Sequence, residues 1–499
     1  MKPDRVSLGL GAAAFLIHAA VAGRYDFFRD ELYFIACGRH PALGYADQPP
    51  LVPLVAAATQ ALGESLVALR LIPALAAAAL VLATGALARR AGGGRFAVAL
   101  AGTAAAVAPM YLGLTTTLNT STFEPLAWTL VALLVGRAVI EEDQRSWIAA
   151  GVVTGIALEA KYEIPLYLVP LGAGLVLTGH VRALARREVA LGVLLAAVLA
   201  APSALWQATH GLPFLALMRA GAAGKNLVLA PLAFVANQVV VMNLLFAPLW
   251  LAGVIAPWAD RHLAPWRFLS VAFVLTFLAM IALHAKDYYL APAYAAMFAL
   301  GAVALEAWVR SKAIRAAYVA AAVLLSAIAA PLAMPILDPP VLARYIRVLG
   351  ANPTPTEARA QSELPQDFAD MVGWRTFVVQ VAAAYHRLPP EDQARAALLT
   401  GNYGEAAAID FFGAAQGLPA AISGHNQYGF WGPRGHDGSV VLRINGDEKL
   451  WRPRCASLEV VQRFGATYAM PYENDAPILL CRGLSTPLPE LWPKLRHID

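Results

Sequence analysis

The chain has 499 residues, of which 59% are apolar and only 14% are charged, whereas soluble domains average about 25% charged residues. This composition excludes an ordinary soluble enzyme and indicates a membrane protein with several spanning segments and room for one soluble domain. The net charge of +5 is modest, and the basic residues lie in short loops between apolar runs. That distribution argues for membrane orientation and against nucleic-acid binding.

The first part of the chain, up to Met334, is dominated by long apolar segments. A bilayer-spanning helix needs about 20 mostly apolar residues, and this criterion predicts about eleven spans. They are Val6–Ala22, Leu66–Ala88, Phe96–Leu112, Thr122–Ile140, Trp147–Ala160, Ile164–Leu177, Val189–Trp206, Pro231–Trp258, Phe268–Leu283, Tyr288–Val309 and Ala316–Met334. The fifth and sixth are short and closely spaced, and the alternative prediction is that they form one broken hairpin.

Basic residues alternate between the predicted loops as the positive-inside rule requires. Lys2 and Arg5 precede the first segment and place the N-terminus in the cytoplasm. The basic clusters that fall on the same side contain Arg90, Arg187, Arg261 and Lys312. We therefore expect a multi-pass protein of the plasma (inner) membrane, with residues 335–499 outside the cytoplasm.

The sequence changes character after Met334, where charged residues, proline and glycine become more frequent. Short apolar runs at Ala396–Thr400 and Ser439–Ile444 predict strands, and Asp367–His386 has the pattern of an amphipathic helix. The predicted organisation is a transmembrane module of residues 1–334, which includes the outer loop 24–65, and a C-terminal extracytoplasmic α/β or α+β domain of residues 335–499.

The three cysteines, Cys37, Cys455 and Cys481, make no metal-ligand or redox pair by spacing. Cys455 and Cys481 bracket the apolar runs Leu458–Val461 and Ile478–Leu480, in a domain predicted to lie outside. If these runs pair as antiparallel strands, both cysteines come to the same end of the pair, as a disulfide requires. Two buried thiols are the alternative. Cys37 is then the free thiol, with no chemical role.

Polar residues predicted at the outer surface come from segments far apart in the sequence. Group transfer from an anionic lipid needs fixed cations for the phosphate, which Lys161 and Lys286 would supply. It also needs a carboxylate base for the acceptor hydroxyl, which Asp30 would supply. The structural alternative is an ion pair within Arg29-Asp30-Glu31 that holds the loop, and this alternative is favoured for Glu31.

Several motifs together resemble those of a known family. They are the acidic pair Asp30-Glu31 after the first segment, the aromatic-Asp-x-Pro-Pro-Leu element in Tyr45–Leu51, the pair Lys161-Tyr162, and the Lys-x-Tyr-Tyr-Leu-x-Pro-x-Tyr run Lys286–Tyr294. They resemble the GT-C glycosyltransferases, in particular bacterial protein mannosyltransferases and aminoarabinose transferases (glycosyltransferase family 39-like). The segment Gly401–Pro433 is similar to the soluble domain of bacterial members.

The resemblance implies the GT-C fold and an inverting transfer of a sugar from a polyprenyl-phosphate-linked donor, outside the cytoplasm. The implied acceptor is a lipid, a polysaccharide or a protein hydroxyl. Asp30, with Glu31 beside it, is the implied catalytic carboxylate, and Lys161 and Lys286 are the implied phosphate ligands. No cofactor is expected.

The remaining candidates for substrate binding are His40, Asp47, Gln48, Glu124, Tyr162, Tyr288 and Tyr289. Relatives often have lysine where this chain has Gln48, so a phosphate contact is not expected there. Many relatives have a second acid at the position of Ser121. In this chain the acid is Glu124, about one helical turn later. No metal-binding motif is present. A metal site made by the carboxylates of Asp30, Asp47 and Glu124 is left as an alternative.

Two other function classes are open at this stage. Broken helices and intramembrane charges also occur in transporters, but the sequence shows no inverted repeat and its charges lie at one surface. A non-catalytic membrane scaffold with an outer recognition domain is the other alternative, and the large acidic first loop fits it poorly.

Overall fold

The structure, a computed structural model, describes residues 4–61, 63–225, 227–351 and 360–499. Lys2 lies outside the described residues. The chain folds into two compact units. The first comprises Met1–Arg24, Val67–Ala204 and Val228–Ile336, and the second comprises Tyr25–Leu66, Leu205–Leu227 and Leu337–Asp499. The boundary after Ile336 lies close to the one predicted at Met334.

The first loop differs from the sequence-based division, because it folds with the C-terminal residues rather than with the transmembrane module. Backbone hydrogen bonds give the reason. The N–H of Asp26 donates to Met371 O at 3.2 Å, and the N–H of Arg29 donates to Asp370 O at 3.0 Å. The loop thus belongs to the second unit.

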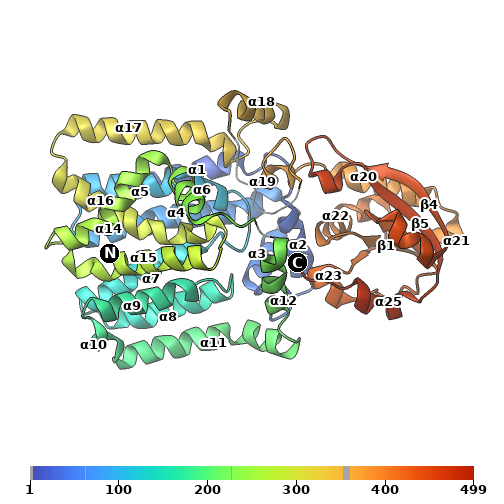
Figure 1. Cartoon of the computed structure of the whole chain (residues 1–499), viewed down its shortest axis with the longest axis horizontal. Helices are drawn as coiled ribbons and strands as arrows, with labels where there is room; N and C mark the ends of the chain where they lie inside the picture. Colours follow the sequence, from blue (N-terminus) through green and yellow to red (C-terminus); the bar gives the residue numbers. More distant parts are fainter. Residues whose placement is uncertain (1–3, 62, 226, 352–359) are drawn as a thin grey trace. The chain divides into compact units, whose positions relative to one another are not determined.

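The first unit is a bundle of apolar helices, many of which run alongside one another (Figure 1). Its helices are α1 (Arg5–Val21), α4 (Leu66–Arg90), α5 (Arg95–Val107), α6 (Pro109–Leu114), α7 (Glu124–Ile140), α8 (Arg145–Leu158), α9 (Pro165–Leu177), α10 (Val181–Leu184), α11 (Arg187–Thr209), α13 (Pro231–Val241), α14 (Ala247–Ala259), α15 (Arg267–Ala282), α16 (Tyr294–Trp308) and α17 (Lys312–Ala329). The last residues of α11 belong to the second unit. Each segment predicted to span the membrane coincides with one or more of these helices.

Within the described ranges, five helices are long and apolar enough to cross a membrane, and six if the bent pair of α13 and α14 counts as one span. Other predicted segments, such as those at α1, α5, α8 and α9, form apolar helices of 10–17 residues. The chain is therefore a multi-pass helical membrane protein. The number of about eleven spans stays a prediction.

Glycines allow the central helices of this bundle to approach closely. A Cβ added at Gly253 on α14 would lie 2.1 Å from Met297 O, and one at Gly301 on α16 would lie 1.9 Å from Leu249 O. Between membrane helices the association comes from packing rather than from a hydrophobic driving force, so small residues at the crossing favour it. Larger side chains at these two positions would force α14 and α16 apart.

The segment Pro231–Trp258, predicted as one helix, is instead two helices bent by 98°. Asn243 lies at the break with a φ of 76°, a left-handed conformation that interrupts a helix. Its side chain accepts from Leu245 N at 2.8 Å and donates to Ala322 O and Ser326 Oγ of α17 at 2.9 and 2.7 Å. The single-helix prediction is wrong because these bonds satisfy polar groups at the break inside the bundle.

The second unit combines the first loop with the C-terminal domain. Its elements are α2 (Arg29–Arg39), α3 (Leu51–Gln60), α12 (Pro213–Ala220), α18 (Pro339–Leu349), α19 (Gln366–Ala369), α20 (Trp374–His386), α21 (Pro390–Gln393), β1 (Ala396–Thr400), α22 (Tyr403–Phe412), β2 (Ala421–Ser423), α23 (Asn426–Trp431), β3 (Val440–Ile444), α24 (Glu448–Trp451), β4 (Cys455–Phe464), β5 (Ala476–Leu484) and α25 (Leu488–Leu495). The predicted helix Asp367–His386 is divided into α19 and α20, because Gly373 adopts a φ of 97° between them.

A five-stranded sheet in the order β2-β1-β3-β5-β4 forms the centre of the C-terminal domain. β1 pairs in parallel with β2 and β3, whereas β5 pairs antiparallel with β3 and β4. The strands predicted at Ala396–Thr400 and Ser439–Ile444 are confirmed as β1 and β3. The domain is thus a small mixed α/β domain, in agreement with the prediction.

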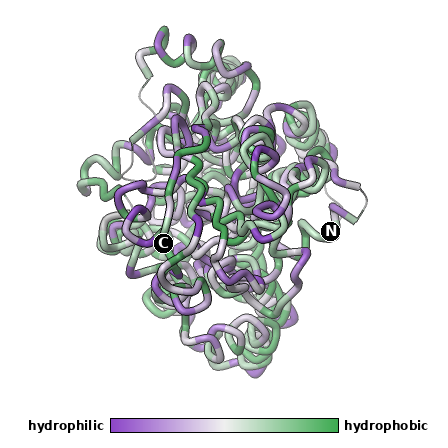
Figure 2. The backbone as a smooth tube through the Cα atoms, turned by 90° about the vertical axis from the view of Figure 1, so that its right-hand side faces the viewer, coloured by the Kyte–Doolittle hydropathy of each residue, from purple (hydrophilic) through white to green (hydrophobic). Residues whose placement is uncertain are grey.

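Several helices pack against this sheet. Alternate residues of the strands, such as Ala397 and Leu399, pack in one core cluster with Leu488 and Trp492 of α25, since side chains alternate between the faces of a strand. The helices α20 and α22 pack against the strands as well. Figure 2 shows hydrophobic strand segments among more hydrophilic loops, as expected for a buried central sheet.

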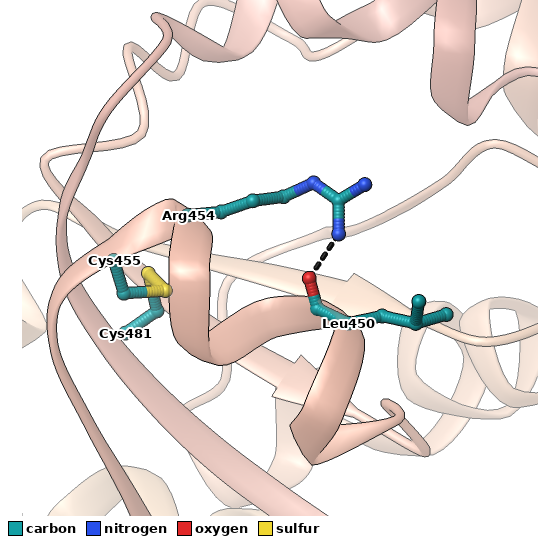
Figure 3. The surroundings of a disulfide bond; sticks show 4 residues. All are labelled: Leu450, Arg454, Cys455 and Cys481. Atoms are coloured by element: carbon teal, nitrogen blue, oxygen red, sulfur yellow. Dashed lines mark hydrogen bonds between the residues drawn. A yellow bond between two sulfur atoms is a disulfide. The ribbon is translucent and has the colours of Figure 1, made fainter.

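A disulfide joins Cys455, at the start of β4, to Cys481 in β5, with the Cα atoms 5.5 Å apart (Figure 3). The strands pair antiparallel, as predicted from the apolar runs. Arg454, just before the disulfide, donates a hydrogen bond to Leu450 O of α24. The predicted pairing is confirmed, and Cys37 is a buried free thiol.

Loss of this disulfide should lower the free energy of unfolding of the second unit by about 3 kcal/mol, because the bond closes a loop with a sequence separation of 26. We expect a reductant to lower the thermal midpoint of the wild-type chain. The Cys455→Ser/Cys481→Ser variant should unfold at that lower midpoint with or without reductant. Equal sensitivity of both proteins to the reductant would contradict this expectation.

Candidate active site

The second unit places Asp30 in the first turn of α2, where a helix N-terminus favours a negative charge. The Tyr403 hydroxyl donates a 2.8 Å hydrogen bond to Asp30 Oδ1. Arg29 Nε lies 3.5 Å from the same oxygen. The Asp30 side chain remains 29% exposed. Its carboxylate is thus held through one oxygen and is accessible to a substrate.

Arg29 fixes this turn to the C-terminal domain. Its Nη1 donates to the Tyr472 hydroxyl at 2.7 Å and lies 3.5 Å from Asp370 Oδ2. Its guanidinium carbon lies 5.4 Å from the centre of the Tyr403 ring. A Cβ added at Gly404 would come within 2.4 Å of the Arg29 side chain. The absent side chain at Gly404 therefore lets α22 bring Tyr403 against the start of α2.

Asp47 forms a second carboxylate position in the same unit. It accepts hydrogen bonds from the Tyr33 hydroxyl at 2.7 Å and from Asn426 Nδ2 at 3.0 Å. Burial raises the pKa of Asp47 to about 6, while the bonds from Tyr33 and Asn426 limit the rise and the charge of Asp30 adds to it. The Tyr33 hydroxyl donates to Asp47 and the Tyr403 hydroxyl donates to Asp30. The centroids of these two tyrosine rings lie 4.5 Å apart.

The three other candidates of the first loop differ in accessibility. Glu31 is fully buried, and its carboxylate accepts at 2.8 Å from the N–H of Phe28, the residue before α2. Gln48 is 2% exposed, and its Nε2 faces Cys37 Sγ at 3.9 Å. His40 is exposed, with its ring centre 4.7 Å from that of Trp431. The side chains of Glu31 and Gln48 are thus enclosed by protein, whereas a substrate can reach the side chain of His40.

The first unit contains the cluster around Lys161. The Lys161 ammonium donates to Ser121 Oγ at 2.9 Å and to Glu124 Oε2 at 3.1 Å, and it forms an ion pair with Glu163. Both carboxylate side chains are 4% exposed and Lys161 is 16% exposed. Burial by itself lowers the pKa of Lys161, but the two carboxylates outweigh it and raise the pKa above its ordinary value. Lys161 therefore remains a cation.

Aromatic rings cover this ammonium. Lys161 Nζ lies 4.2 Å from the centre of the Tyr289 ring and 5.3 Å from that of Tyr288, within the range of cation–π attraction. Tyr162 follows Lys161 in the same turn and is half-buried. The structure thus brings Lys161, Glu124, Tyr288 and Tyr289 of the predicted set together.

Lys286 comes just before Tyr288 and is half-buried. Its neighbour Asp287 begins the short helix Asp287–Ala293 and accepts from Asn237 Nδ2 at 2.7 Å. Gln238 Nε2 donates to Asp287 O at 2.9 Å. These two bonds tie the run that carries Lys286 to α13.

Sequence reasoning missed two residues of these clusters, Tyr403 and Asn426. Tyr403 and Asn426 lie in the Gly401–Pro433 segment, which carried the family resemblance, but their partners are several hundred positions away in the sequence. Glu163, a charged residue expected at the outer surface, forms an ion pair with Lys161.

Comparison with known proteins gives one family match and several structural matches. Residues 47–206 match a family described as dolichyl-phosphate-mannose-protein mannosyltransferase. The matched range contains Asp47, Glu124 and Lys161, whereas Asp30 and Lys286 lie outside it. No curated protein sequence matches the chain.

Two crystal structures of ArnT from Cupriavidus metallidurans are similar to the chain. The structure bound to undecaprenyl phosphate has a TM-score of 0.62 and 14% identity, and the match covers 96% of this chain and 98% of ArnT. The apo structure has a TM-score of 0.63 and 14% identity, with 95% and 97% covered. At this identity the likeness establishes the fold. The chain therefore has the fold of ArnT, and about a third of it matches the mannosyltransferase family.

Proposed function

We propose that this chain transfers a sugar from a polyprenyl-phosphate-linked donor to an acceptor hydroxyl, with inversion at the anomeric carbon. The observation that carries the proposal is the Asp30 carboxylate, which Tyr403 holds through Oδ1 and which remains 29% exposed. A general base needs this combination of a fixed position and access to the substrate. The match to dolichyl-phosphate-mannose-dependent transferases and the fold shared with ArnT, which was crystallised with undecaprenyl phosphate, support the donor class.

In the proposed step, the acceptor oxygen attacks the anomeric carbon from the face opposite the phosphate. Its proton passes to Asp30, and a new glycosidic C–O bond forms. The bond between the anomeric carbon and the phosphate oxygen breaks, and its electron pair leaves with the polyprenyl phosphate. A hydroxyl on a lipid, a polysaccharide or a protein fits this step equally.

Lys161 and Lys286 are proposed to bind the donor phosphate, because a buried anion needs fixed cations. Lys161 already pairs with two carboxylates and is 16% exposed. A phosphate that reaches it must therefore share the ammonium with Glu124 and Glu163. Lys286 is half-buried as well.

We propose that the chain lies in the cytoplasmic (inner) membrane with its N-terminus inside and its C-terminal domain outside. The alternation of basic clusters along the sequence supports this orientation. The disulfide between Cys455 and Cys481 also supports it, because disulfides persist in oxidising compartments outside the cytoplasm.

Cysteine labelling in intact cells tests this orientation. Cys37 is buried and the other two cysteines are bonded, so a single introduced cysteine is the accessible thiol. An impermeant maleimide should label Gln416→Cys in intact cells and Arg187→Cys only after permeabilisation. Labelling of Gln416→Cys only in permeabilised cells would contradict the proposed orientation.

A transfer assay with the purified full chain tests the proposed activity and separates it from the transporter alternative, which the comparisons do not favour. A glycosyltransferase in sealed vesicles consumes the lipid-linked sugar and releases polyprenyl phosphate. A transporter moves a solute across the vesicle membrane and leaves the donor lipid unchanged.

A further inference from the structure

The end of the chain is joined to the segment before α23 by backbone pairing. The N–H of His497 donates to Gly424 O at 2.9 Å, and the N–H of Asn426 donates to His497 O at 3.0 Å. His425 and His497 are therefore partners in a parallel bridge. Paired residues of neighbouring strands point their side chains to the same face, and so do residues two positions apart in extended chain. The sequence His497-Ile498-Asp499 thus presents His497 and Asp499 on the face of His425.

The side chains confirm this placement. The imidazole rings of His425 and His497 stack with centroids 4.6 Å apart. Asp499 Oδ1 lies 3.0 Å from His425 Nε2 and 3.7 Å from His497 Nε2. The three ligand atoms all lie within 4.8 Å of one another. A zinc ion about 2.0–2.2 Å from each ligand atom places tetrahedral ligands roughly 3.3–3.5 Å apart, close to the 3.0 and 3.7 Å between Asp499 Oδ1 and the two imidazole nitrogens.

We propose that His425, His497 and Asp499 form a Zn²⁺ site. Two imidazoles and one carboxylate are ligands that suit zinc, whereas calcium and magnesium prefer sites made of oxygen atoms alone. Three protein ligands leave the fourth tetrahedral position for a water molecule. Sequence spacing gave no signal for the site, because His425 is far from the other two ligands along the chain. The proposal of a metal site here does not rest on the proposed glycosyl transfer.

The zinc ion would fasten the chain end to a segment that holds the first loop. Asn426, next to His425, donates to Asp47, and the neighbouring Gln427 accepts from Ala46 N at 2.9 Å. Metal binding at His425 therefore orders the residues that position Asp47. The Tyr403 ring, whose hydroxyl contacts Asp30, also lies 4.8 Å from the His425 ring.

Metal titration of the purified full chain, first stripped with a chelator, tests this site. We expect the wild type to bind one Zn²⁺ per chain by calorimetry and to gain thermal stability on binding. His497→Ala removes a half-exposed ligand, and it should weaken binding at least about 100-fold, since even partners outside the ligand shell are worth about 10–100-fold. His386→Ala is the matched control, because His386 is an exposed histidine of the same domain that contacts Gln416 O. It should bind zinc like the wild type.

Cobalt substitution provides a second measurement that does not depend on the stability of a variant. Co²⁺ bound by the wild type should give the intense visible absorption of a four-coordinate nitrogen and oxygen site, and Asp499→Asn should reduce it. The proposal is overturned if the wild type binds neither metal. It is equally overturned if His497→Ala, with the thermal midpoint of the chelated wild type, binds zinc as tightly as His386→Ala.

Discussion

Replacing Asp30 with asparagine should lower the turnover of sugar transfer by a factor of about 10² or more, the usual cost of losing a general base. The substitution conserves size, and an amide oxygen can still accept the hydrogen bond that Tyr403 donates to Oδ1. Arg29 keeps its contacts with Tyr472 and Asp370. The variant therefore loses basicity and little else, and the initial rate of transfer at saturating donor measures that loss.

Asp26→Asn is the matched control for this variant. Asp26 belongs to the same loop, but its carboxylate pairs with Arg375, whose side chain is 66% exposed. The Asp26 side chain is itself 17% exposed, and the pair is separate from the hydrogen bond that holds Asp30, so turnover should stay within a few-fold of wild type. If Asp30→Asn also kept near-normal turnover, the base would have to be another carboxylate. Asp47 would then be the leading candidate, because Glu31 is buried at the start of α2.

Replacing Lys161 with methionine should destabilise the chain by about 3–5 kcal/mol, because it leaves the buried carboxylates of Glu124 and Glu163 without their cation. The thermal midpoint of the purified variant in detergent measures this effect. Adding Glu163→Gln removes one of the stranded charges, so the double variant should recover part of the lost stability. Arginine at this position should rescue partly at best, because its fork differs from an ammonium in shape.

Donor use separates the structural role of Lys161 from the proposed role in phosphate binding. The Lys161→Met/Glu163→Gln variant should fold and still show a raised KM for the lipid-linked donor. Lys286→Met should raise the same KM, because a buried phosphate loses a cation there as well. If a phosphate-free analogue of the donor loses binding to the same extent in these variants, both lysines are structural and the phosphate proposal is wrong.

The features that could be predicted from the sequence depend on local patterns. Apolar length predicted where the membrane helices lie, and short apolar runs predicted β1 and β3. The pairing of Cys455 with Cys481 followed from two neighbouring apolar runs. Each of these inferences needed only residues that are close together in the sequence.

The features that could not be predicted depend on tertiary contacts. A single asparagine, Asn243, bends an apolar run that otherwise reads as one helix. Tyr403 reaches Asp30 because Gly404 lets α22 pack against Arg29, and no local pattern encodes that contact. The grouping of the first loop with the C-terminal residues has the same origin, since backbone bonds across long sequence separations hold it there.

The most direct test of the central claim is a donor screen with the purified full chain and the Asp30→Asn variant. Polyprenyl phosphates that carry different sugars are incubated with hydroxyl acceptors, and the product is analysed for its anomeric configuration and for released polyprenyl phosphate. The wild type should convert at least one donor to a product of inverted configuration, release one polyprenyl phosphate per transfer, and lose this activity in Asp30→Asn. A product with retained configuration, or transfer that is unchanged in Asp30→Asn, would contradict the account.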